Sequence, residues 1–195
     1  VYLFHSSFYL SNSATGIQYD EAIRLSKEVH TIYFIYCNGM MSQCFNNIRG
    51  ESALCYICKS KYKKEKKRFN EFINFVEIPE LLNESNIRNI KSYNLDYKNI
   101  EDIKRLEYRD INIGLGALSG YISKSRNLSP LIDDEFRYFF DENLRNAMIN
   151  VEAVSIAIEK IKPDHIVLYN GRFADSKPIW QLALKYNLPY TTLEA

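Results

Sequence analysis

Short runs of apolar and β-branched residues alternate along the chain with longer segments in which apolar residues recur every three or four positions. Runs of the first kind are typical of buried strands, and segments of the second kind are typical of amphipathic helices. Their alternation is the pattern of a parallel sheet covered by helices. The predicted strands are residues 1–5, 30–36, 72–78, 164–169 and 189–193.

The predicted helices fall between these runs. The clearest is 133–162, in which Leu144, Val151 and Ile158 belong to one apolar face, and Pro163 ends it. Weaker helical patterns cover 17–28, 100–108 and 178–186. We therefore expect one α/β domain over residues 1–195, with a Rossmann-like parallel sheet and flanking helices.

The net charge and the lack of long apolar stretches restrict the possible functions. Lys+Arg 25 against Asp+Glu 24 leaves a formal net charge of +1, which argues against a nucleic-acid partner. No apolar stretch approaches the roughly 20 residues of a membrane span, and no signal peptide opens the chain, so we expect a cytoplasmic protein. The chain begins and ends inside predicted strands, which suggests a fragment of a two-domain protein.

All four cysteines fall within residues 37–58, as Cys37, Cys44, Cys55 and Cys58 in the spacing C-x6-C-x10-C-x2-C. A C-x-x-C pair can place two thiolates on one tetrahedral metal ion, so the leading prediction is a structural zinc site in a four-cysteine loop. Free buried cysteines, a redox pair and an iron–sulfur cluster are the alternatives.

The sequence KSKYKKEKKR, residues 59–68, is the strongest local charge bias. It could attract phosphate, anionic lipid or nucleic acid, or it could be a solvated helix face or loop. Tyr62 is the only aromatic residue within it, which disfavours a stacking platform for single strands. Contact with the inner membrane surface is the functional interpretation that we prefer.

Ligands of open α/β sheets bind beyond the carboxyl ends of the strands. Three segments should meet there: HSSFYLSNS after the first strand, NGRFADSK after the strand 164–169, and the residues after Thr192. The first lacks the G-x-G-x-x-G of dinucleotide sites. In the second, Asn170 and Gly171 predict a tight turn that projects Arg172, which could bind phosphate or carboxylate or pair with Asp175.

Several segments together resemble a known family. They are YCNGMMSQC with the following CYIC, DINIGLGALSGYISKSR, KPDHIVLYNGRFADSKPIWQLA and a closing TLE. In this order they resemble bacterial capsule and surface-polysaccharide biosynthesis proteins, which are glycosyltransferase-like proteins of the two-Rossmann (GT-B) type. The resemblance implies the N-terminal, acceptor-side domain, with a sugar or lipid-linked sugar as acceptor and the nucleotide-sugar donor on a second domain.

The resemblance also implies which residues border the cleft. Glu194 and His5 would orient or deprotonate the acceptor hydroxyl. The substrate-binding candidates are Asn170, Gly171, Arg172, Ser119 and Arg126. This half alone should be inactive. The rival hypotheses are a non-catalytic, metal-pinned scaffold domain of a membrane-associated assembly, and a flavodoxin-like nucleotide-binding regulator.

Overall fold

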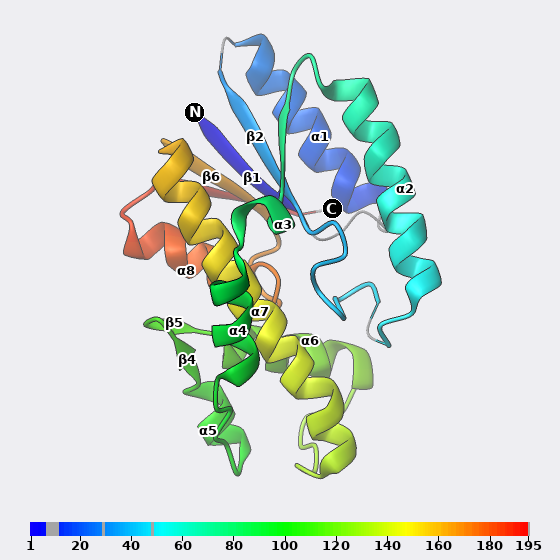
Figure 1. The fold of residues 1–195 in the computed structure, drawn as a ribbon, viewed down its shortest axis with the longest axis vertical. Coiled ribbons are helices and arrows are strands. Elements are labelled where there is room, and N and C mark those ends of the chain that lie inside the picture. Colours follow the sequence, from blue (N-terminus) through cyan, green and yellow to red (C-terminus); the bar gives the residue numbers. More distant parts are fainter. Residues whose placement is uncertain (7–11, 29, 48, 195) are drawn as a thin grey trace.

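The structure is a computed structural model that describes residues 1–6, 12–28, 30–47 and 49–194. Its centre is a sheet of five parallel strands in the order β3-β2-β1-β6-β7 (Figure 1). The strands are β1 (Tyr2–Ser6), β2 (Ile32–Tyr36), β3 (Asn74–Glu77), β6 (His165–Tyr169) and β7 (Tyr190–Leu193). Each lies inside a predicted strand or within one residue of it, so the predicted Rossmann-like sheet is confirmed.

Helices cover both faces of this sheet. They are α1 (Asn12–Lys27), α2 (Ser52–Phe69), α3 (Ile78–Leu81), α4 (Glu84–Ser92), α5 (Ile100–Lys104), α6 (Gly114–Ser125), α7 (Asp134–Ile161) and α8 (Lys177–Lys185). The basic run 59–68 belongs to α2, and the small-residue stretch after residue 113 forms α6. A two-stranded hairpin of β4 (Glu107–Tyr108) and β5 (Ile111–Asn112) lies apart from the main sheet.

Alternating side chains divide the core into two layers, because successive residues of a strand point to opposite faces. Phe4 and Phe34 pack with residues of α1 and α2 on one face. Leu3 and Ile35 pack with residues of α7 and α8 on the other face. In Figure 1, α1 and α2 accordingly lie on one side of the strands and α7 and α8 on the other.

Helix α7 organises the rest of the molecule. Its N-terminus is capped by Asp133, whose carboxylate accepts a hydrogen bond from the Phe136 amide at 2.9 Å. Its middle, residues 146–154, is buried on every side, which explains why that segment is almost free of charge. The helix continues beyond the sheet and packs there against α4 and α6 (Figure 1).

The one acidic residue of that buried stretch, Glu152, is fully partnered. Its carboxylate accepts hydrogen bonds from the Tyr108 hydroxyl and from Asn86, and it lies 2.8 Å from the Arg109 Nε. Glu152 therefore ties the hairpin and α4 to α7. Among the described residues, no helix has the length and apolar character needed to cross a membrane.

Candidate functional site

The five strands end at one edge of the sheet, and the chain changes direction there. Strand β1 pairs with β2 on one side and with β6 on the other, while β3 lies beyond β2 and β7 beyond β6. The order reverses between β1 and β6, and open α/β sheets bind their ligands beyond the carboxyl ends of the strands at such a point. The loop after β2, residues 37–51, and the loop after β6, residues 170–176, border it.

The turn after β6 has the predicted geometry. Asn170 and Gly171 both have φ of 66°, in the left-handed region that Asn tolerates and Gly adopts without strain. The Gly171 amide donates to the Tyr169 carbonyl at 2.9 Å. Beyond the turn Arg172 is exposed, with its guanidinium carbon 5.1 Å from the centre of the Phe173 ring. Its role in binding phosphate or carboxylate stays a prediction.

Asp175, three residues further on, is the most unusual charged group at this edge. Its side chain is 4% exposed, and neither carboxylate oxygen accepts a hydrogen bond from another described residue. Within the described part of the chain no ion pair joins it to Arg172, contrary to the pairing considered from the sequence. Burial raises the pKa of Asp175 to about 7, and its own backbone amide offsets this only in part. A carboxyl group with this pKa can accept and return a proton near neutral pH.

Asp175 lines a small pocket between the two loops, α6 and α7. Most of the walls are apolar, the polar ones are amides or a thiol, and no described lining residue is cationic. The lining residues are Met41, Gln43, Cys44, Phe45, Gly120, Phe139, Asn143, Asn146, Phe173, Ala174 and Asp175. The carboxyl group of Asp175 is therefore the one ionisable acid of this lining, and it has no counter-charge there.

Two aromatic rings close the space between the loops. Phe45 from the loop after β2 stacks on Phe173 from the loop after β6, with ring centres 4.0 Å apart. Lys124 lies 4.2 Å from the Phe45 centroid, as Arg172 lies near Phe173. Because the inner faces of the rings cover each other, the two cations occupy the outer faces. The loop connection is thus an aromatic pair flanked by positive charge.

Buried amides on α7 hold the strand ends in place. The Asn146 side chain donates to the Gln43 carbonyl, and Asn150 lies 3.0 Å from the Nε2 of His5. Gln18 donates to the His5 carbonyl at 2.9 Å. Burial lowers the pKa of His5 to about 4, so its ring is neutral at physiological pH. These contacts give His5 a packing role. Its predicted role as a base is not tested by them.

The other predicted site residues are dispersed. Ser119 is half-buried in α6, and Arg126 is exposed at the C-cap of that helix with φ of 58°. Glu194 is exposed after β7, on the far side of β6 from β1. None of these three lines the Asp175 pocket. The hydroxyl-rich segment predicted to contribute after β1 falls mostly on residues 7–11, which lie outside the described residues.

The four cysteines surround a second small pocket, which Tyr36 also lines. Cys55 and Cys58 lie on α2 rather than in a loop. No group of three or more His, Cys, Asp or Glu side chains within the described ranges could hold a metal ion, so the zinc-site prediction for Cys37, Cys44, Cys55 and Cys58 is wrong.

Local contacts and burial explain this correction. Three of the sulfur atoms accept hydrogen bonds from separate partners: Met41 N to Cys37 at 3.4 Å, Asn47 to Cys55 at 3.3 Å and the Tyr36 hydroxyl to Cys58 at 3.7 Å. Burial raises the pKa of Cys37 to about 11 and that of Cys44 to about 12. In the metal-free protein these thiols are therefore protonated, and they pack as small, weakly polar groups.

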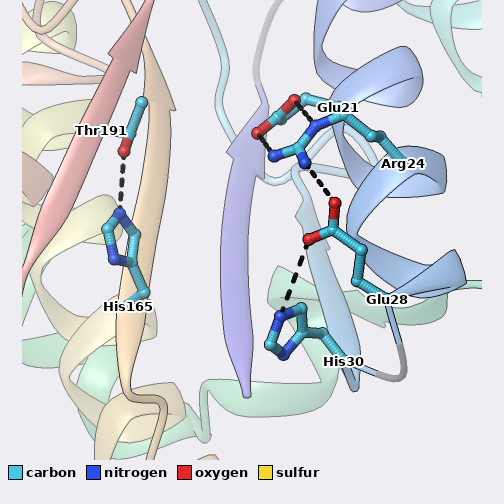
Figure 2. A network of polar contacts seen from close by, with 6 residues as sticks. All are labelled: Glu21, Arg24, Glu28, His30, His165 and Thr191. Carbon is cyan, nitrogen blue, oxygen red and sulfur yellow. Dashed lines mark hydrogen bonds and ion pairs between the residues drawn. The ribbon is translucent and has the colours of Figure 1, made fainter.

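The polar networks with the remaining histidines lie elsewhere (Figure 2). Arg24 on α1 makes paired hydrogen bonds to Glu21 and a further one to Glu28, whose carboxylate is 4.0 Å from His30. His165, the first residue of β6, contacts the Thr191 hydroxyl at 2.8 Å. Both histidines stand where strands begin, at the edge opposite the candidate site.

Comparison with known proteins finds similarity in fold and none in sequence. No protein-family model matches the sequence, and a search among curated proteins finds no match either. Among solved structures, a CDPS (cyclodipeptide synthase) from Fluoribacter dumoffii has a similar fold, with a TM-score of 0.56 and 13% sequence identity. The alignment covers 98% of this chain and 88% of that chain. At this level of identity the similarity establishes the fold.

This match overturns the interpretation drawn from the sequence motifs. A glycosyltransferase domain of GT-B type from capsule biosynthesis is not supported, because a solved structure with a similar fold is a cyclodipeptide synthase and no family model links the chain to polysaccharide enzymes. The alternative of a metal-pinned scaffold domain is not supported either, because the described residues contain no group that could hold the metal. Strand-end and turn motifs recur throughout Rossmann-like folds, so they predicted the architecture and not the reaction.

Proposed function

We propose that this chain is an aminoacyl-transferring enzyme of the cyclodipeptide synthase type, with Asp175 as its proton-transfer group. The observation that carries the proposal is the buried, unpaired Asp175 carboxyl at the switch point of a sheet whose fold matches a cyclodipeptide synthase over 98% of the chain. Perturbed acids in the crevice of such a sheet are typical of catalytic sites.

The chemistry requires a group of this kind. A cyclic dipeptide forms in two steps. The amine of one aminoacyl ester first attacks the ester carbonyl of a second, and the free amine of the resulting dipeptidyl ester then attacks the remaining ester. In each step a C–N bond forms, a C–O bond breaks and one alcohol leaves. Asp175 would accept the proton that the nitrogen loses and return it to the departing alkoxide, and its pKa of about 7 suits both transfers.

We expect the acyl donor to arrive already activated, because the sequence has no G-x-G-x-x-G, and its nearest variant, GLGALSG at residues 114–120, lies inside α6 and does not follow a strand of the parallel sheet. Aminoacyl-tRNA is an activated aminoacyl ester of this class. The sequence argued against a nucleic-acid partner on the net charge of +1. Local charge gives a different expectation, because α2 presents the cations Lys63, Lys64, Lys67 and Arg68 to solvent.

The direct test is product formation. Purified protein incubated with aminoacyl-tRNAs, or expressed in a bacterial host, should yield cyclic dipeptides detectable by mass spectrometry. Asp175→Asn preserves shape but cannot accept the proton, so it should lower the rate at least about 100-fold, as expected for loss of general base catalysis. Asp110→Asn is the matched control, because Asp110 is 90% exposed and its φ of 61° suits Asn equally well.

Two results would refute the proposal. One is the absence of any cyclic dipeptide from a folded protein supplied with a full set of aminoacyl-tRNAs. The other is undiminished synthesis by Asp175→Asn, which would leave the fold assignment intact but remove Asp175 from the reaction.

A further inference from the structure

The segment that joins α6 to α7 exposes apolar side chains. Of the large apolar side chains in the described part of the chain, the three most exposed are Tyr138, Leu131 and Leu128, at 81%, 80% and 76%. All three lie within residues 126–138, at the end of the molecule where α7 extends beyond the sheet (Figure 1). Apolar residues that are exposed together on one surface commonly mark an interaction site, whereas isolated ones need no explanation.

These side chains lie around a groove of about 450 Å³ between α6 and the first turns of α7. The apolar part of its lining is formed by Tyr121, Leu131, Phe136 and Phe139. Leu128 follows Asn127, another lining residue. Tyr138 borders the groove, because it lies three residues after the lining residue Glu135 and such residues are neighbours on a helix. We call the groove together with Leu128 and Tyr138 the α6–α7 surface.

The two walls of the groove carry opposite charges. Lys124 lines it from the α6 side and Glu135 lines it from the α7 side, and both are exposed. Arg126 and Asp134, exposed at the ends of the same two helices, extend this separation of charge. Among the described residues no ion pair joins the cations of one wall to the acids of the other. Both signs of charge are therefore free to pair with another molecule.

We propose that the α6–α7 surface binds a second copy of this chain, in a twofold-symmetric dimer that pairs Lys124 with Glu135 of the partner subunit. An apolar groove with one positive and one negative wall is complementary to itself, because a twofold rotation places unlike walls together. A partner with one strong charge sign would instead be repelled by one wall. In the dimer Leu128, Leu131 and Tyr138 of both copies leave water, which supplies the driving force.

The α6–α7 surface is next to the candidate site. Phe139 lines both the groove and the small pocket that contains Asp175. A second copy seated in the groove therefore contacts one wall of the candidate site. Dimer formation does not require the proposed reaction, so either one can fail without the other.

Sedimentation velocity of the wild-type protein over a range of about 1 to 200 µM measures the association, and we expect a dissociation constant within that range. Leu131→Asp and Tyr138→Ser should each raise it at least about tenfold, because each change removes an apolar contact that occurs twice in the dimer. Tyr56→Ser is the matched control, because Tyr56 is 73% exposed on α2, outside this surface. It should leave the dissociation constant unchanged.

Charge reversal tests the predicted pairing. Lys124→Glu alone, or Glu135→Lys alone, places like charges together at both contacts of its homodimer, so each variant should dimerise at least about tenfold more weakly than wild type. An equimolar mixture of the two variants restores opposite charges at both contacts. The mixture should therefore form heterodimers at concentrations where each variant by itself is monomeric.

Three results would overturn the proposal. A wild-type protein that stays monomeric up to about 200 µM would leave the surface to a different protein. Dimers that withstand Leu131→Asp and Tyr138→Ser would form through another part of the molecule. A mixture of the charge variants that stays monomeric would remove the pairing of Lys124 with Glu135. Circular dichroism of each variant checks that lost association does not come from unfolding.

Discussion

The pKa values of two buried ionisable residues near the strand ends are shifted in opposite directions. Burial raises the pKa of Asp175 to about 7 and lowers that of His5 to about 4. In each case the cause is the same, because desolvation disfavours the charged form. Near neutral pH, His5 is therefore uncharged and the carboxyl group of Asp175 is only partly ionised.

This arrangement predicts the pH dependence of stability. Below its unfolded pKa of 3.8, Asp175 is protonated in both states and costs nothing. As the pH rises from 3.8 to about 7, Asp175 ionises in the unfolded chain but stays protonated in the folded protein. The folded protein therefore loses stability over this range, by on the order of 4 kcal/mol in total. Asp175→Asn should lack this loss.

Urea unfolding of both proteins at pH 5 and pH 8 measures the effect. The free energy of unfolding of Asp175→Asn minus that of wild type should be larger at pH 8 than at pH 5. His5 contributes a loss of stability as the pH falls from about 6.5 toward 4, and because both proteins share it, it cancels in the difference. An unchanged difference would mean that Asp175 is solvated in the folded protein.

At the scale of elements, α6 depends on a glycine at its first turn. A Cβ on Gly114 would lie 1.7 Å from the Ile103 carbonyl oxygen, so α5 and α6 approach as closely as they do only because this residue has no side chain. Gly114 is therefore a packing residue, whereas a Cβ on Gly120 of the same helix would make only an ordinary contact with the Phe173 ring, at 4.0 Å.

We predict that Gly114→Ala destabilises the fold by at least about 2 kcal/mol, because either the helices must separate or the backbone must distort. Gly16→Ala should instead stabilise by roughly 0.5–1 kcal/mol, because Ala favours the helix and meets nothing. Thermal unfolding of both variants checks the pair. A neutral Gly114→Ala would show that α5 is not held against α6 in solution.

At the scale of the whole molecule, charge is nearly balanced but unevenly placed. The net charge is +1, yet residues 59–68 contain seven Lys or Arg and one Glu on a single helix. Lys66 forms an ion pair with Glu77 at 3.2 Å, whereas Lys63, Lys64, Lys67 and Arg68 are exposed to solvent. The exposed side of α2 thus carries a local positive charge that is not apparent from the net charge of the chain.

If α2 contacts the phosphates of an RNA carrier, replacing Lys63, Lys64 and Lys67 with Gln should weaken binding and reduce its salt dependence. The slope of log K against log salt should fall by roughly 2, since each released phosphate contact contributes about 0.7–0.9. Filter binding of tRNA at salt concentrations between about 50 and 200 mM measures this slope. Over that range the affinity of a protein for nucleic acid typically falls by roughly 10³-fold or more. Unchanged tRNA binding together with lost binding to anionic vesicles would assign α2 to a membrane surface instead.

The sequence by itself determined the architecture. Apolar runs such as 164–169 were predicted as strands because a strand buried on both faces has no polar positions, and the long helix to Pro163 followed from its period. The left-handed turn at Asn170 and Gly171 was predicted for the same local reason, since few other residues tolerate that backbone. Patterns of this kind depend on neighbours within a few positions, so they survive without tertiary information.

Which polar groups are buried without a partner depends on the tertiary structure. Asp175 was considered in the sequence merely as a partner for Arg172, and its burial without that partner depends on residues brought in by α6, α7 and the loop after β2. The cysteine spacing predicts a metal site, but with Cys55 and Cys58 on α2 and Cys37 and Cys44 on the loop after β2, the described residues contain no group that could hold a metal ion. Desolvation and convergence are properties of contacts between distant segments, and no local pattern encodes them.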